Sequence, residues 1–127
     1  MKFDFNQPIL RANGESFKSA PETEGGEVTL AYASTFIGSA LLAAFKDEVD
    51  TLTGEDKHKR YKLSQRIFSS HNQWVDACAG LEDDEPNPVM YTDVTIEELT
   101  LIKLVISKGY QTELAGALIE VIENPKG

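Results

Sequence analysis

The sequence predicts a mainly α fold: a small helical domain of about four helices with an N-terminal β-hairpin. Three observations lead to this prediction. Apolar residues recur at three- and four-residue steps over several separate stretches. Thr53 and Thr95 are each followed three residues later by an acid, a pattern typical of helix starts. Alternation of apolar and polar residues, which favours a strand, marks the opening residues. The length of 127 residues suits a single domain.

Residues 1–17 are predicted to form the β-hairpin, in one of two registers. The first pairs residues 3–5, whose phenylalanines alternate with polar neighbours, with the apolar pair that follows the first proline. The second closes the hairpin at Asn13-Gly14 and pairs residues around Ile9 with residues around Phe17, because this dipeptide readily adopts positive backbone angles. The sequence leaves both registers open.

A loop and a first helix are expected next. Residues 18–28 collect Ser, Pro, Glu, Thr and Gly without apolar periodicity, so we expect a mobile loop. From Thr29, a suitable N-cap, apolar residues recur at helical steps to Ala44. This first helix of the predicted two-helix region 29–79 is apolar over most of its circumference. We therefore expect it to be the central helix of the domain.

The second helix of this region is predicted to begin after Thr53, where Asp56 resembles the acid of a capping box. Its apolar positions from Tyr61 onward define a face broad enough to pack. The helix either continues to Cys78 or breaks near Ser69-Ser70.

The last third of the chain is predicted to be a linker followed by a helical hairpin. Residues 80–94 are acidic and contain two prolines, so we expect a surface linker with room for a short strand at 89–91. Thr95 and Glu98 can form a capping box for a helix over 96–108. A final helix begins near Thr112, and the two helices should pack antiparallel within residues 95–124.

Charge is spread unevenly along the chain. The formal net charge is -9, from 21 acids and 12 bases, which argues against binding bare nucleic acid with the whole surface and favours a protein partner. Glu82 to Glu85 form an acidic run. Five bases fall within ten positions of the second helix, and we predict them as the partner-binding residues: Lys57, Lys59, Arg60, Lys62 and Arg66.

The basic cluster has three interpretations. Lys59, Lys62 and Arg66 recur at helical spacing on one side, where they could contact an acidic protein or phosphates. The same residues could instead form a solvated face that pairs with nearby acids.

The residues needed for catalysis or metal binding are scarce. His58 falls within the basic cluster, and His71 and Cys78 lack the further ligands of a zinc site. Glu97-Glu98 is explained by helix capping, and Gly25-Gly26 lacks the lysine and spacing of a phosphate-binding loop. We expect no catalytic residue, no metal and no cofactor.

The sequence also bears on the compartment. The opening residues do not resemble a signal peptide, and the apolar stretch from Phe36 to Phe45 is too short to span a membrane. The single cysteine, Cys78, suits a reducing environment. We expect a cytoplasmic protein without membrane contact.

Four stretches of the chain are notable for the order in which they occur. They are Lys2-Phe3-Asp4-Phe5-Asn6-Gln7-Pro8-Ile9, Thr29-Leu30, Gly54-Glu55-Asp56-Lys57 leading to Arg60 and Leu63, and Thr95 with Glu97-Glu98. In this order they resemble small accessory proteins of tailed bacteriophages and prophages. The resemblance implies a non-enzymatic assembly factor, tail chaperone, adaptor or inhibitor in the host cytoplasm.

The leading functional hypothesis is therefore a phage-type accessory or assembly protein that binds a phage or host protein and that can also self-associate. One alternative is an acidic inhibitor of a host nucleic-acid enzyme, in which the acidic run Glu82 to Glu85 and other surface acids imitate a phosphate backbone. Another is nucleic-acid binding through the basic helix 57–66. An enzyme is the least favoured class.

Overall fold

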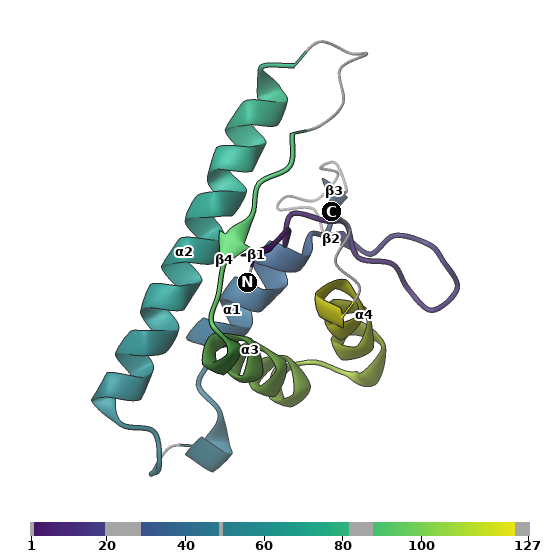
Figure 1. Cartoon of the computed structure of the whole chain (residues 1–127). Coiled ribbons are helices and arrows are strands. Elements are labelled where there is room, and N and C mark those ends of the chain that lie inside the picture. The colour runs from purple at the N-terminus through teal and green to yellow at the C-terminus, as the bar shows by residue number, and fades with distance from the viewer. Residues whose placement is uncertain (1, 20–28, 49, 82–87, 124–127) are drawn as a thin grey trace, which may run out of the picture.

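The computed structural model describes residues 2–19, 29–48, 50–81 and 88–123, and it has the predicted mainly α architecture (Figure 1). Residues 20–28 of the predicted loop and residues 82–87 of the predicted linker lie outside this description. The elements in chain order are β1 (Lys2–Phe3), β2 (Lys18–Ser19), β3 (Thr29–Leu30), α1 (Ala33–Leu42), the 3-10 turn η1 (Lys46–Glu48), α2 (Gly54–Ala79), β4 (Thr92–Asp93), α3 (Ile96–Gly109) and α4 (Thr112–Glu123).

Helix α1 is the central helix, as predicted. It contacts α2, α3 and α4, and it lies in the middle of the fold in Figure 1. Its Ile37 is fully buried, together with residues from each surrounding helix. The fully buried large side chains include Phe5, Ile9, Leu63, Ile67, Ile102, Ile106 and Leu118. This single core joins all four helices to the N-terminal segment.

The start of α1 corrects the sequence prediction, because Thr29 lies in β3 and the N-cap is Tyr32. No side chain caps this helix. Its first free backbone N–H groups are satisfied from another segment: Ala33 donates to the carbonyl of Gln7 at 3.0 Å, and Ser34 to that of Phe5 at 2.7 Å. The N-terminal segment therefore decides where α1 begins.

The hairpin follows the second of the two predicted registers. Leu10 and Ser16 form an antiparallel bridge, and Gly14 has a φ of 89°, which glycine adopts at little cost. A ring of three backbone hydrogen bonds then joins the hairpin to the segment before α1. Phe17 donates to Ile9 at 2.8 Å, Ile9 to Ala31 at 3.1 Å, and Ala31 to Phe17 at 2.9 Å.

Phe3 pairs far from the hairpin, which excludes the first register. β1 lies antiparallel to β4, with Phe3 opposite Thr92. The strand expected at 89–91 is therefore found at 92–93. Lys18 and Ser19, predicted within the mobile loop, instead form β2, which pairs with β3.

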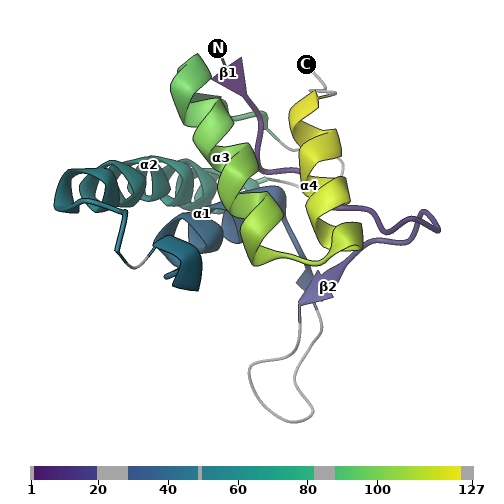
Figure 2. The ribbon, with the colours of Figure 1, turned by 90° about the horizontal axis from the view of Figure 1, so that it is seen from below.

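The remaining helices follow their predicted bounds closely. α2 continues without a break to Ala79, and Gly80 is its C-cap. α3 and α4 lie side by side and antiparallel, as Figure 2 shows. Helices α1 and α2 come especially close at Gly38, whose carbonyl accepts a hydrogen bond from Ser64 Oγ at 3.1 Å. A Cβ atom at position 38 would lie only 2.5 Å from the ring of Phe68.

Candidate functional site

Helix α2 presents the predicted partner-binding residues, and local interactions fix where it begins. Thr53 Oγ1 accepts from the Asp56 N–H at 3.1 Å, while the Thr53 N–H donates to the Asp56 carboxylate at 3.2 Å. Hydrogen bonding from Thr53 to the carboxylate lowers the pKa of Asp56. The helix has 26 residues and is therefore about 39 Å long. One of its long sides is turned away from the core.

Arg60 must be removed from the predicted set, because it is buried. Its guanidinium donates to both carboxylate oxygens of Glu48, at 2.8 and 2.7 Å. Lys108 lies 3.2 Å from the same carboxylate. These contacts, chiefly the hydrogen bonds from Arg60, lower the pKa of Glu48 from 4.5 to about 2. Arg60 therefore joins α2 to η1, and its guanidinium is already paired with Glu48.

Arg66 is half-exposed, but its guanidinium is already held in place. It donates to both oxygens of Glu98, at 2.7 and 3.0 Å, and to the carbonyl of Asp93 at 2.7 Å. Glu98 also accepts from the Thr95 N–H in the capping box of α3. Arg66 thus connects α2 to the end of β4 and the start of α3, and it neutralises one acid there.

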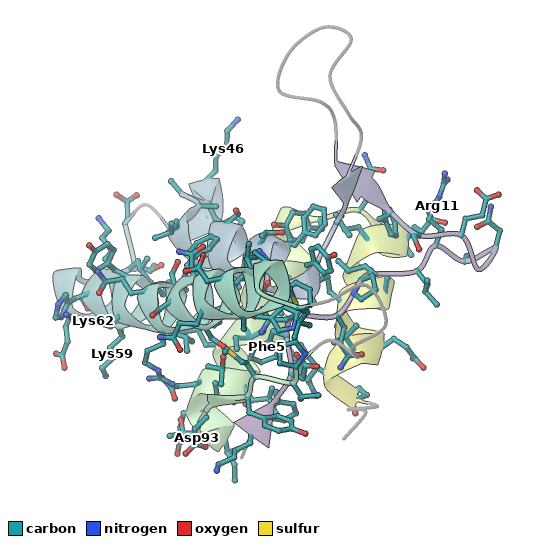
Figure 3. All side chains as sticks on the ribbon, turned by 90° about the horizontal axis from the view of Figure 1, so that it is seen from above. Phe5, Arg11, Lys46, Lys59, Lys62 and Asp93 are labelled. Carbon is teal, nitrogen blue, oxygen red and sulfur yellow. The ribbon has the colours of Figure 1, made fainter. Side chains whose placement is uncertain are left out.

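The three lysines of the set are exposed but lie on two sides of α2. Lys59 and Lys62 project side by side (Figure 3), on the same side as Arg66, as their helical spacing predicts. Lys57 lines a hollow on another side of the helix. Lys59 lies 3.8 Å from Glu55, whereas Lys57 and Lys62 have no ion pair among the residues described.

A groove, which we call the α2 groove, runs along the side that carries Lys59, Lys62 and Arg66. Its larger part has a volume of about 750 Å³, and its smaller part, about 410 Å³, lies against the start of α3. Lys62 lines both parts. The larger part is otherwise lined by Gln65, Arg66, Ser69, Ser70, Gln73, Met90, Tyr91 and Thr92, and the smaller by His58, Lys59, Leu63, Thr95, Glu97, Glu98 and Leu101.

An apolar surface lies on the other flank of the ridge formed by Gln65, Ser69 and Gln73. Leu42 at the end of α1 is 55% exposed, and Tyr61 of α2 is 49% exposed. Both line two adjoining hollows of about 320 and 620 Å³. We call this the Leu42–Tyr61 surface; its apolar residues are Leu42, Ala43, Ala44, Phe45, Tyr61 and Phe68, and polar side chains, chiefly of α2, also line the two hollows.

Sequence reasoning missed a buried polar cluster around His71. Its Nδ1 lies 2.8 Å from Ser34 Oγ and 3.1 Å from Asn6 Oδ1. Since an amide oxygen can only accept, Nδ1 carries the hydrogen. The rings of Tyr32 and Trp74 pack against the imidazole, and burial lowers the pKa of His71. The helical position of His71 gave no signal of this cluster, because its partners are remote in sequence.

The His71 cluster is not arranged as a nucleophile and its base. Ser34 is 1% exposed, so a substrate cannot reach its hydroxyl. Asn6 and Ser34 also approach the same ring nitrogen, whereas a catalytic triad uses the two nitrogens separately. The arrangement instead joins the N-terminal segment, α1 and α2.

The other candidates for chemistry are dispersed. His58 is exposed in the α2 groove, and Cys78 is half-buried near the end of α2. Within the described ranges, His, Cys, Asp and Glu nowhere gather in a group of three or more that could hold a metal ion. Among the helices described, none has the length and apolar character required to cross a membrane.

Comparison with known proteins adds no relative: the chain matches no protein-family model, no curated protein and no solved structure.

Proposed function

We propose that this chain is a non-enzymatic accessory or assembly protein, of the phage type that its opening residues resemble, and that it acts by binding a protein partner. The observation that carries the proposal is the Leu42–Tyr61 surface. Two large apolar side chains from different helices stand half-exposed next to each other over adjoining hollows. Contiguous exposed apolar groups of this kind are typical of protein interfaces.

The side chains of this surface suit a protein interface. Tyr61 offers an apolar ring with a hydroxyl that accepts a hydrogen bond from Gln65 at 3.0 Å. Tyrosines of this kind are enriched among residues that dominate interface energies. Lys57 lies at the edge of the same surface and is exposed, so it can meet an acidic group on the rim of a partner.

The ion pairs of the described residues make two alternative functions less favoured. Nucleic-acid binding through residues 57–66 loses Arg60 to burial, and Arg66 already pairs with Glu98. A phosphate mimic needs unpaired acids, and the run Glu82 to Glu85 lies outside the described residues. Among the described residues, many acids pair with bases. Such acids are Asp47, Glu48, Glu55, Glu98, Glu113 and Glu123.

The test is affinity capture from host and phage lysates, followed by size-exclusion chromatography with light scattering on each captured complex. We expect the wild-type chain to form one stoichiometric complex with a protein, and the double variant Leu42→Ser/Tyr61→Ser to lose it. Leu104→Ser is the matched control, because Leu104 is also exposed but lies on α3. Thermal unfolding of each variant confirms that it folds.

A second measurement locates the contact. Hydrogen exchange should slow at residues 41–45 and 61–68 when the captured protein is bound. The proposal is wrong if the double variant retains the same complex, or if the chain remains a monomer that captures only nucleic acid in a salt-sensitive way.

A further inference from the structure

The α2 groove carries positive charge that the fold does not use. Lys62 is exposed, lines both parts of the groove and has no ion pair among the described residues. The Lys59–Glu55 pair is 3.8 Å long between side chains that are 69% and 80% exposed, so it contributes little and can be exchanged. In a chain of net charge -9, these lysines form a local basic site.

The far wall of the groove is an extended segment of main chain held beside α2. Trp74 Nε1 donates to the carbonyl of Pro88 at 2.8 Å, and Arg66 donates to that of Asp93. The segment runs along α2 toward α3 in Figure 1. Tyr91 of this segment is 46% exposed and lines the groove. The groove therefore lies between α2 and this segment, and the segment is held to α2 near both of its ends, at Pro88 and at Asp93.

The polar groups that line the groove suit a polypeptide backbone. Gln65, Gln73, Ser69 and Tyr91 carry amides and hydroxyls that can both donate and accept hydrogen bonds. A peptide backbone offers both kinds of group at each residue, whereas a phosphate only accepts. Ser70 also lines the groove, and its buried Oγ has no hydrogen-bond partner among the described residues.

The carboxylates at one end of the groove disfavour nucleic acid. Glu97 and Glu98 line the smaller part, beside Lys59 and Lys62. Glu98 is neutralised by Arg66, but Glu97 would repel a continuous row of phosphates. A peptide carries its charges at separate side chains, so it can place acids at the lysines and a neutral residue near Glu97.

The length of the groove sets the length of the ligand. Its lining residues on α2 extend from His58 to Gln73, which corresponds to about 22 Å along the helix. An extended chain rises about 3.3 Å per residue, so roughly six or seven residues fill this length.

We propose that the α2 groove binds an extended acidic segment of a protein partner, with Lys59 and Lys62 contacting its carboxylates. This site is separate from the Leu42–Tyr61 surface, and the two flank the ridge of Gln65, Ser69 and Gln73. A protein with both sites could hold two parts of one partner or join two partners.

The test is fluorescence anisotropy with labelled heptapeptides of alternating Glu and Thr, compared with the same peptides carrying Gln for Glu and with a seven-nucleotide single-stranded DNA. We expect the acidic peptide to bind most tightly. The double variant Lys59→Glu/Lys62→Glu should weaken this binding by about tenfold or more, since two exposed ion pairs become repulsive. Higher salt should weaken the wild-type interaction.

The matched control is Lys2→Glu/Lys46→Glu. It makes the same change of net charge with two exposed lysines that do not line the α2 groove. We expect it to change the affinity far less than the groove variant does. If the two double variants weakened peptide binding equally, the weakening would come from long-range charge rather than from contacts in the groove, and the proposal would be overturned. Equal binding of the Gln peptide, tighter binding of the DNA, or no acidic-peptide binding would also overturn it.

Failure of this proposal is distinguishable from failure of the proposed function. Leu42→Ser/Tyr61→Ser should bind the acidic heptapeptide as the wild-type chain does, because neither residue lines the α2 groove.

Discussion

Arg60 and Glu48 form a bidentate ion pair inside the protein, with both N–O distances below 3 Å. The two side chains are only 6% and 11% exposed. The pair joins α2 to η1, and Lys108 of α3 approaches the same carboxylate. Three separate elements thus meet at Glu48.

Replacing Glu48 with Gln should destabilise the fold strongly, because the buried charge of Arg60 would lose its counter-ion. We expect the free energy of unfolding to fall by roughly 3 kcal/mol in urea denaturation. The double variant Glu48→Leu/Arg60→Met should recover most of this loss, since an apolar pair can replace a buried ion pair. Glu55→Gln, which changes an exposed pair, should cost less than about 0.5 kcal/mol. Equal effects of the two Gln variants would contradict the importance of burial.

The stability of the fold should depend on pH through His71. Burial lowers the pKa of His71 below 6.5, so the unfolded chain binds the proton more readily than the folded one does. The stabilising contribution of the neutral ring is complete above pH 6.5 and is lost as the pH falls through this value toward the lower folded pKa. We expect the unfolding midpoint in urea to decrease over this window.

Two histidine variants separate this effect. His71→Gln should remove the pH dependence, whereas His58→Gln, which changes an exposed histidine, should keep it. If His58→Gln lost the pH dependence, the dependence would come from His58, and the prediction for His71 would be wrong. An NMR titration of the His71 ring provides a direct readout.

Gly38→Ala should destabilise the protein although Ala is the better helix former. The new Cβ would lie 2.5 Å from the Phe68 ring, and crowding of this kind costs about 1 to 3 kcal/mol. In a Phe68→Ala background the crowding is absent, and the same substitution should stabilise by up to about 1 kcal/mol. The double-mutant cycle measures the coupling by urea denaturation. A coupling of zero would mean that Phe68 moves aside without cost.

Thr95→Ala should cost about 1 kcal/mol of stability, because it removes the hydroxyl that caps α3. Thr100→Ala is the control within the same helix, since Thr100 only bonds back to the carbonyl of Ile96 and Ala has the higher helix propensity. We expect Thr100→Ala to be neutral or slightly stabilising in thermal unfolding. A similar loss in both variants would show that the cap contributes nothing specific.

Much of the helical architecture could be predicted because its signals are local. The capping boxes at Thr53 and Thr95 each involve residues three positions apart, and both are present in the structure. α2 also continues past Cys78, the later of its two predicted ends, to its C-cap at Gly80. The start of α1 could not be predicted in this way, because it is set by carbonyls of Phe5 and Gln7 rather than by a nearby side chain.

The candidate site could be predicted only in part. Spacing correctly placed Lys59, Lys62 and Arg66 on one side of α2, since the helical repeat alone decides this. Burial of Arg60 could not be predicted, because its partner Glu48 precedes the helix and lies 12 positions away in the sequence. The Leu42–Tyr61 surface could not be predicted either, because in the sequence both residues look like ordinary apolar positions of helices.

The sequence by itself determined the helices, the capping boxes of α2 and α3, the excess of negative charge and the concentration of bases on one helix. These features depend on residue type and on spacings of a few positions, which the chain keeps in any environment. Tertiary structure alone decided the hairpin register, the start of α1, the polar cluster at His71 and the fate of each base. Those depend on which distant segments exclude water from a given side chain and supply its partner, as Glu48 does for Arg60 and as the N-terminal segment does for α1.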